Sequence, residues 1–175
     1  MSRLERIAGA LDALAEFTGR VTAWLTAAMV VVTGWIVVQR YWFDSGSIAV
    51  QESVLYLHAV VIMLGAAYTL RHDGHVRVDI FYQRAGRRAK ALIDLAGTLL
   101  LLLPMTVFIG WISYDYVAAS WSIHESSHDA GGLPGVYLLK STILAMAALV
   151  SLQGIAHALR AIAALRGSPA KAAAK

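Results

Sequence analysis

Two histidines flank a glutamate in the stretch HESSHDAGGLP, residues 124–134. The spacing His124-Glu125-x-x-His128 is that of zinc peptidases, in which a helix presents both histidines to the metal and the glutamate deprotonates a bound water. A third protein ligand is also required. In the extended motif HExxHxxGxxH the third ligand is a histidine, but the corresponding position here is Pro134, which cannot ligate. Glutamate is the other common third ligand, and none follows Glu125 in the chain. Because AGGLPG also ends a helix, the zinc motif is incomplete.

The segments that must position these residues are strongly apolar. Hydrophobic residues make up 58% of the 175-residue chain and charged residues only 15%, against about 25% in soluble domains. Four stretches contain no Asp, Glu, Lys or Arg: residues 21–39, 53–70, 95–114 and 141–159. As helices, each would be about 27–30 Å long, the thickness of a bilayer's hydrocarbon core. The composition therefore predicts an all-α, polytopic membrane protein with four transmembrane helices.

The predicted domain organisation is simple. The spans are expected at about 21–42, 52–70, 91–116 and 138–160, within a single four-helix membrane domain over residues 1–163. Residues 164–175 are expected to form a disordered cytoplasmic tail. The absence of cysteine excludes disulfides and iron–sulfur ligation.

The positions of lysine and arginine predict the orientation. Residues 1–20, 71–90 and 160–175 carry 13 of the 15 basic residues, and the other two connections hold only Arg40 and Lys140. By the positive-inside rule both termini and the 71–90 loop face the cytoplasm. The net charge of +4 therefore indicates topology and attraction to the lipid bilayer, and no nucleic-acid partner.

Two segments outside the spans are predicted to be amphipathic. In residues 1–18, apolar side chains repeat every three or four residues, which indicates an interfacial helix before the chain turns at Gly19 into the membrane. In the 71–90 loop, a second short interfacial helix is expected to break at Gly86. Its apolar stripe is Val78, Phe81, Tyr82 and Ala85. A solvated basic loop is the alternative.

Few polar residues lie inside the predicted spans. His58 and His157 could ligate a haem only at equal depth, but they lie roughly 8 Å and 24 Å below the outer boundary. His58 is therefore interpreted as a hydrogen-bonded packing residue. Pro104 is expected to kink the third span. Since no proton relay or ion pathway is evident, a scaffold or accessory subunit is favoured over a catalyst.

Two segments resemble the small integral-membrane (permease) subunit of tripartite ATP-independent periplasmic (TRAP) transporters. One runs from Gly65 through Arg71, His75 and Arg77 to Asp79 as it leaves the second span. The other precedes the fourth span and contains Trp121, Glu125, Ser127, Gly131, Gly132, Leu133 and Pro134. Lys140 and Gln153 also match. The resemblance covers residues from about 52 to 153, and the Gly-Gly-Leu-Pro element is most similar to the mannitol/chloroaromatic-compound branch.

This resemblance implies a division of labour among three proteins. A large membrane subunit of about twelve spans would carry the substrate and Na⁺ sites, and a periplasmic solute-binding protein would deliver an organic acid or related solute. The small subunit would scaffold the large one in the bacterial inner membrane. It would be neither an enzyme nor a cofactor-binding protein, with no metal site and no substrate site of its own.

The resemblance also supplies structural or partner-interface candidates. Glu52, Arg71, His75, Arg77 and Asp79 are expected to fix the ends of the second span and the cytoplasmic corner through charge-assisted hydrogen bonds. Trp121, Glu125, Gly132, Leu133, Pro134 and Lys140 would shape an outer turn, with Lys140 pairing with Glu125 or Asp129. Gly65 and Gln153 complete the set. Solvated interfacial charges, and snorkelling of Lys140, are the alternatives.

Alternatives from other classes are left open by the residues alone. One is a membrane zinc metallopeptidase acting through residues 124–128. The other is a free-standing four-helix protein, either a small exporter or a haem anchor.

Overall fold

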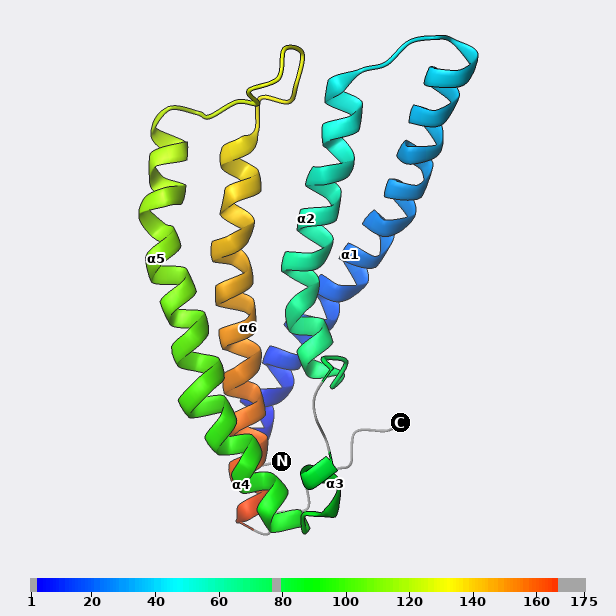
Figure 1. Ribbon diagram of the computed structural model, residues 1–175. Helices are drawn as coiled ribbons and strands as arrows, with labels where there is room; N and C mark the ends of the chain where they lie inside the picture. Colours follow the sequence, from blue (N-terminus) through cyan, green and yellow to red (C-terminus); the bar gives the residue numbers. More distant parts are fainter. Residues whose placement is uncertain (1–2, 77–79, 167–175) are drawn as a thin grey trace.

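The computed structural model describes residues 3–76 and 80–166, and every regular element within them is helical. Four helical stretches are long and apolar enough to cross a membrane: Leu4–Trp42, Ile48–Arg71, Arg87–Ser122 and Val136–Leu165. The all-α prediction with four transmembrane helices is confirmed, and each predicted span lies within one of these stretches. Figure 1 shows them as two helix pairs, and the loop that joins the two helices of each pair lies at the top of the view.

Helix α1, Arg3–Trp42, is continuous over 40 residues, so the predicted turn at Gly19 is wrong. The glycine instead permits close helix packing, because a Cβ at this position would lie 2.2 Å from the ring of Tyr68. No proline interrupts residues 3–42, and the amphipathic amino-terminal part therefore continues directly into the span (Figure 1).

Helix α2, Ile48–Arg71, returns antiparallel to α1. The Ser47 side chain caps it by accepting a hydrogen bond from the Val50 N–H, which satisfies one of the free donors of the first turn. Asp44, in the connection, has a φ of 43°, a left-handed conformation that aspartate tolerates better than most residues. A short, tight turn thus pairs the two helices.

The helical stretch that contains the third predicted span extends beyond it at both ends and contains one irregularity. It is built from α4 (Arg87–Gly97), a π-helical turn η1 (Thr98–Leu102) and α5 (Leu103–Ser122). Pro104 has no N–H to donate to the carbonyl four residues earlier. The π-turn immediately before it, closed by the bond from Leu103 N to Thr98 O, accommodates this interruption.

A short helix, α3 (Ile80–Arg84), precedes α4, and Gly86 caps α4. This agrees with a short helix in the 71–90 loop that ends before Gly86. The Tyr82 hydroxyl donates to Asp94 Oδ2 at 2.8 Å, which holds α3 against α4. Of the predicted apolar stripe, Val78 and the side chain of Phe81 lie outside the described residues.

Helix α6, Val136–Leu165, is the central element and packs against α1, α2, α4 and α5. Its buried residues are mostly small, which lets the neighbouring backbones approach closely. They are Ala147, Gly154, Ala156, Ala158, Ala161 and Ala163, together with Gln153. The helix continues past the predicted boundary at residue 163, and residues 167–175 of the predicted tail lie outside the described residues.

Candidate functional site

The 123–135 loop between α5 and α6 is held by two carboxylates. We name Glu52, Glu125, Ser127, Leu133 and Lys140 the outer cluster. Glu52, on the first turns of α2, accepts hydrogen bonds from the Ser127 hydroxyl and from the Leu133 N–H, the latter at 2.6 Å. Lys140, on α6, donates to Glu125 Oε2 at 2.5 Å. One loop is thereby fastened to two helices.

Gly132 lets the loop approach α2 closely. A Cβ at this position would lie 2.5 Å from the Ser127 side chain and 2.8 Å from Glu52 Oε1. The loop also closes on itself, since Ser127 N donates to Leu133 O at 3.1 Å and Val136 N donates to Glu125 O at 3.1 Å. The Gly-Gly-Leu-Pro element thus forms a compact turn, as the resemblance implied, with Pro134 exposed at its end.

The Glu125–Lys140 pair has a defined electrostatic consequence. The hydrogen bond from the Lys140 ammonium lowers the pKa of the Glu125 carboxyl below its ordinary value. The ammonium also lies 4.1 Å from the centre of the Tyr116 ring, within range of a cation–π interaction. The predicted pairing of Lys140 is therefore formed with Glu125.

Trp121 fixes the end of α5 against the start of α6. Its indole Nε1 donates to the Ser141 hydroxyl at 2.8 Å, and its ring packs edge-on against Tyr137 with centroids 4.7 Å apart. These contacts hold together the two helix ends between which the loop runs.

The zinc interpretation fails on geometry. Residues 124–128 form no helix, and His124 has a φ of 46°, so the motif cannot present both histidines on one helix face. The His124 ring packs on Tyr137 instead, and the Glu125 carboxylate accepts a hydrogen bond from Lys140. Within residues 3–76 and 80–166, no group of three or more His, Cys, Asp or Glu side chains is placed to hold a metal ion.

A second polar cluster lies at the opposite end of the bundle. We name Asp12, Glu16, Arg71, Gln153 and Arg160 the inner cluster. Arg71 Nη1 donates to the Asp12 carbonyl at 2.8 Å and to Glu16 Oε2 at 2.5 Å, which joins α2 to α1. The Asp12 carboxylate accepts from Gln153 Nε2 at 3.0 Å and pairs with Arg160, which joins α1 to α6.

The inner cluster combines residues that were predicted with residues that were missed. Arg71 and Gln153 were candidates, and Gln153 is 1% exposed. Asp12, Glu16 and Arg160 were missed, as was Ser127 in the outer cluster. Asp12 and Glu16 lie within residues 1–18, the segment predicted to be an interfacial helix. Only the continuous path of α1 brings them against α2 and α6.

The other candidates belong to neither cluster. Gly65 and His75 both line a groove between α1 and α2. Arg77 and Asp79 lie outside the described residues. His157 Nδ1 lies 3.4 Å from the Thr98 hydroxyl, whereas the His58 side chain is exposed.

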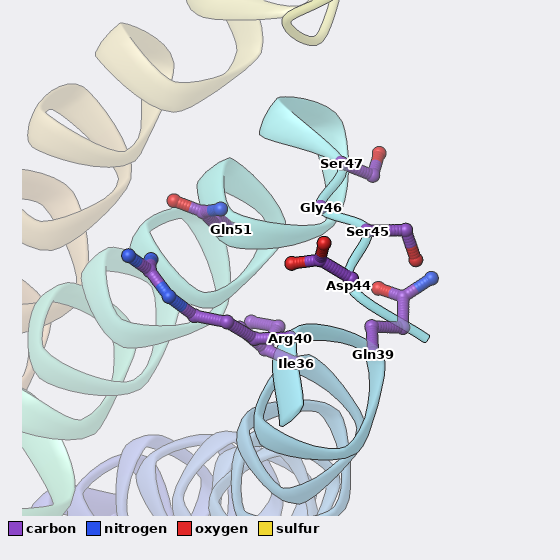
Figure 2. Close-up of a pocket in the computed structure, with 8 residues that line it drawn as sticks. All are labelled: Ile36, Gln39, Arg40, Asp44, Ser45, Gly46, Ser47 and Gln51. Atoms are coloured by element: carbon purple, nitrogen blue, oxygen red, sulfur yellow. The ribbon is translucent and has the colours of Figure 1, made fainter. Parts of the chain in front are cut away.

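A pocket of about 240 Å³ lies beside the turn between α1 and α2. Figure 2 shows that the Arg40 guanidinium extends away from Asp44 and toward the side of α2 that carries Gln51. In the described part of the chain Arg40 forms no ion pair. This small pocket lies at the same end of the bundle as the outer cluster, but none of its lining residues belongs to either cluster.

Comparison with known proteins identifies the family. The model of the family described as tripartite ATP-independent periplasmic transporters, DctQ component, matches residues 29–164, which are 136 of the 175 residues. No curated protein and no solved structure matches the chain. Four apolar helices and a loop tied to them by paired charges fit a membrane subunit. The chain belongs to the DctQ family, the small membrane subunits of TRAP transporters, and is a transporter component rather than an enzyme.

Proposed function

We propose that this DctQ subunit is a scaffold for the large membrane subunit of its transporter. The observation that carries the proposal is that its charged side chains bind the chain's own helices and loop to one another. Glu52, Glu125 and Lys140 bind the 123–135 loop, named the outer loop from here on, to α2 and α6. At the other end of the bundle, Asp12 and Arg71 bind α1 to α2 and α6. These groups brace the bundle at its two ends.

Between the clusters the helices meet through small and hydroxyl side chains. The Thr106 and Ser151 hydroxyls lie 2.7 Å apart and hydrogen-bond to each other, and Ala147 is buried nearby on α6. Contacts of this kind join helices without lining a route for an ion or a solute. We therefore assign the substrate site and the Na⁺ site to the large subunit.

The setting of the complex follows from the same proposal. The chain would lie in the bacterial cytoplasmic membrane with both termini inside, as the distribution of lysine and arginine favours. The outer cluster would then face the periplasm, on the side where a solute-binding protein arrives. The transported solute would be an organic acid or a related compound.

The candidate residues receive structural roles in this proposal. Glu52, Trp121, Glu125, Gly132, Leu133, Pro134 and Lys140 would maintain the outer loop, and Arg71 and Gln153 the inner end. Gly65 and His75 would belong to the groove between α1 and α2. For Arg77 and Asp79 the proposal rests on the sequence alone.

Co-purification tests the proposal. The chain carries an affinity tag and is co-expressed with the large TRAP membrane subunit of the same organism, and the complex is extracted in mild detergent. We expect the two subunits to elute together in a fixed ratio in size-exclusion chromatography. Separate elution of two folded subunits would refute the scaffold role.

A further inference from the structure

His58 occupies an unusual position for a membrane protein. It lies on α2, six residues after Glu52, and hence about 9 Å deeper in the membrane at 1.5 Å per residue. Its side chain is exposed, and within the described part of the chain it has no hydrogen-bond partner. An imidazole carries both donor and acceptor capacity, and hydrocarbon satisfies neither. Ionisable residues at such a depth normally face protein or a water-filled cavity.

The residues around His58 form a regular seam. Gln51, Leu55, His58 and Ile62 are all exposed and follow one another at alternating intervals of four and three residues. This is the spacing with which one helix presents a continuous stripe to another. We name these four residues the α2 seam.

The α2 seam continues into a groove. Gly65 and Thr69 extend the same spacing toward the other end of α2, and both line a groove of about 480 Å³ whose opposite wall includes Gly19 and Thr22 of α1. A Cβ at position 65 would lie 3.8 Å from Thr22 Oγ1, an ordinary contact distance. The chain's own packing therefore does not require glycine at position 65. A second helix approaching along the groove would benefit from its small size.

A charge on α1 without an ion pair among the described residues, Arg40, lies beside the outer end of the α2 seam. The Arg40 guanidinium extends toward the side of α2 on which Gln51 lies (Figure 2). The side chain is exposed and has no ion pair among the described residues. A partner helix that satisfies His58 within the membrane would reach Arg40 near the outer surface.

We propose that the α2 seam and the groove that continues it are the docking face for one membrane helix of the large subunit. That helix presents a hydrogen-bonding side chain or carbonyl to His58 and an acceptor, preferably a carboxylate, to Arg40. The assignment of the occupant rests on the proposed function. The depth of His58 argues for a membrane helix, because a soluble protein does not reach it and acyl chains do not hydrogen-bond.

Photo-cross-linking tests the docking face directly. The chain contains no cysteine, so Leu55→Cys and Val107→Cys each provide one attachment point for a benzophenone maleimide. The two native side chains are matched, being 64% and 63% exposed on α2 and α5 respectively. In membranes that contain the large subunit, we expect position 55 to give a cross-link to that subunit several-fold stronger than position 107.

The alternatives give distinct products. A cross-link from position 55 to a second copy of this chain would overturn the assignment of the occupant, and equal or reversed yields at the two positions would overturn the docking face. If the wild-type chain does not retain the large subunit at all, the proposed function itself fails. If it does and position 55 gives no cross-link, only the inference fails.

A His58→Leu variant separates docking from folding. Loss of one hydrogen bond between membrane helices should lower the association constant for the large subunit about threefold. The unfolding temperature of the isolated chain should stay the same or rise, because an unpartnered imidazole is replaced by an apolar side chain. Unchanged association with the large subunit would show that His58 does not contact it.

Discussion

Glu52 shows how a single side chain can order a whole loop. Its two carboxylate oxygens accept from donors on the 123–135 loop, Ser127 Oγ and Leu133 N, more than 70 positions away in the sequence. Because the Leu133 N–H can only donate, the atom that faces it must be an acceptor, whereas the Ser127 hydroxyl could also accept a hydrogen bond.

We therefore expect Glu52→Gln to destabilise the outer loop. The amide nitrogen would face the Ser127 hydroxyl and the amide oxygen would face the Leu133 N–H, so two charge-assisted hydrogen bonds become neutral ones and the unfolding temperature should fall by a few degrees. Asp44→Asn, in the exposed turn after α1, is the matched control, since asparagine also tolerates the left-handed conformation. Equal unfolding temperatures for the two variants, measured by intrinsic tryptophan fluorescence in detergent, would contradict this account.

Glu125 gives a prediction about pH. Its pKa is lowered in the folded chain by the Lys140 ammonium, so the pair stabilises the fold above the unfolded pKa of about 4.3. That contribution is lost as the pH falls through the lower folded pKa. We expect the difference in unfolding temperature between wild type and Glu125→Gln to shrink as the pH is lowered toward about 3. A difference that is constant or grows with acidity would exclude the pair as a stabilising interaction.

Much of the outer cluster could be predicted from the sequence, and much of the inner cluster could not. The separation between Glu125 and Lys140 is short, and a loop between two spans must bring them to the same side of the membrane. Asp12 and Arg160 are 148 residues apart. Their pairing depends on the path of α1 past α6, which no local pattern specifies.

Among the elements, α1 shows why the sequence could mislead. An amphipathic stretch followed by Gly19 and an apolar stretch is typical of an interfacial helix and a separate span. Glycine is also the residue that permits close contact between helices, and here the contact with Tyr68 requires it. A single sequence does not distinguish these two uses of glycine, whereas the four apolar spans follow directly from composition.

Two glycines of α1 make a matched test. Gly19→Ala places a methyl group against the Tyr68 ring and should cost about 1–3 kcal/mol through forced displacement of α2. Gly34→Ala has nothing within 4 Å of the added carbon, so it should be neutral or should stabilise the helix slightly. Unfolding temperatures of the two variants measure the difference. If Gly19→Ala is as stable as Gly34→Ala, the close approach of α1 and α2 is incorrect.

At the scale of the whole molecule, orientation can be tested with single cysteines. Ser126 lies in the 123–135 loop and Gln83 on α3, and both side chains are exposed. With both termini in the cytoplasm, Ser126→Cys should react with an impermeant maleimide in spheroplasts, and Gln83→Cys only after permeabilisation. The reverse pattern of labelling would invert the topology and place the outer cluster in the cytoplasm.

The small subunit is best understood as a helix bundle that hydrogen bonds and ion pairs stabilise at both ends, and that supports another polypeptide. Its charged residues tie α1, α2, α6 and the outer loop to one another, and its apolar surface is available to lipid and to a partner. DctQ family membership and this use of charge agree.

Uptake by reconstituted vesicles tests the central claim most directly. A labelled solute that the solute-binding protein of the transporter captures is offered, with that protein and an inward Na⁺ gradient, to vesicles containing the small subunit alone, the large subunit alone, or both. We predict accumulation with both subunits and none with the small subunit alone. Gradient-driven uptake by vesicles that hold only this chain would contradict the account.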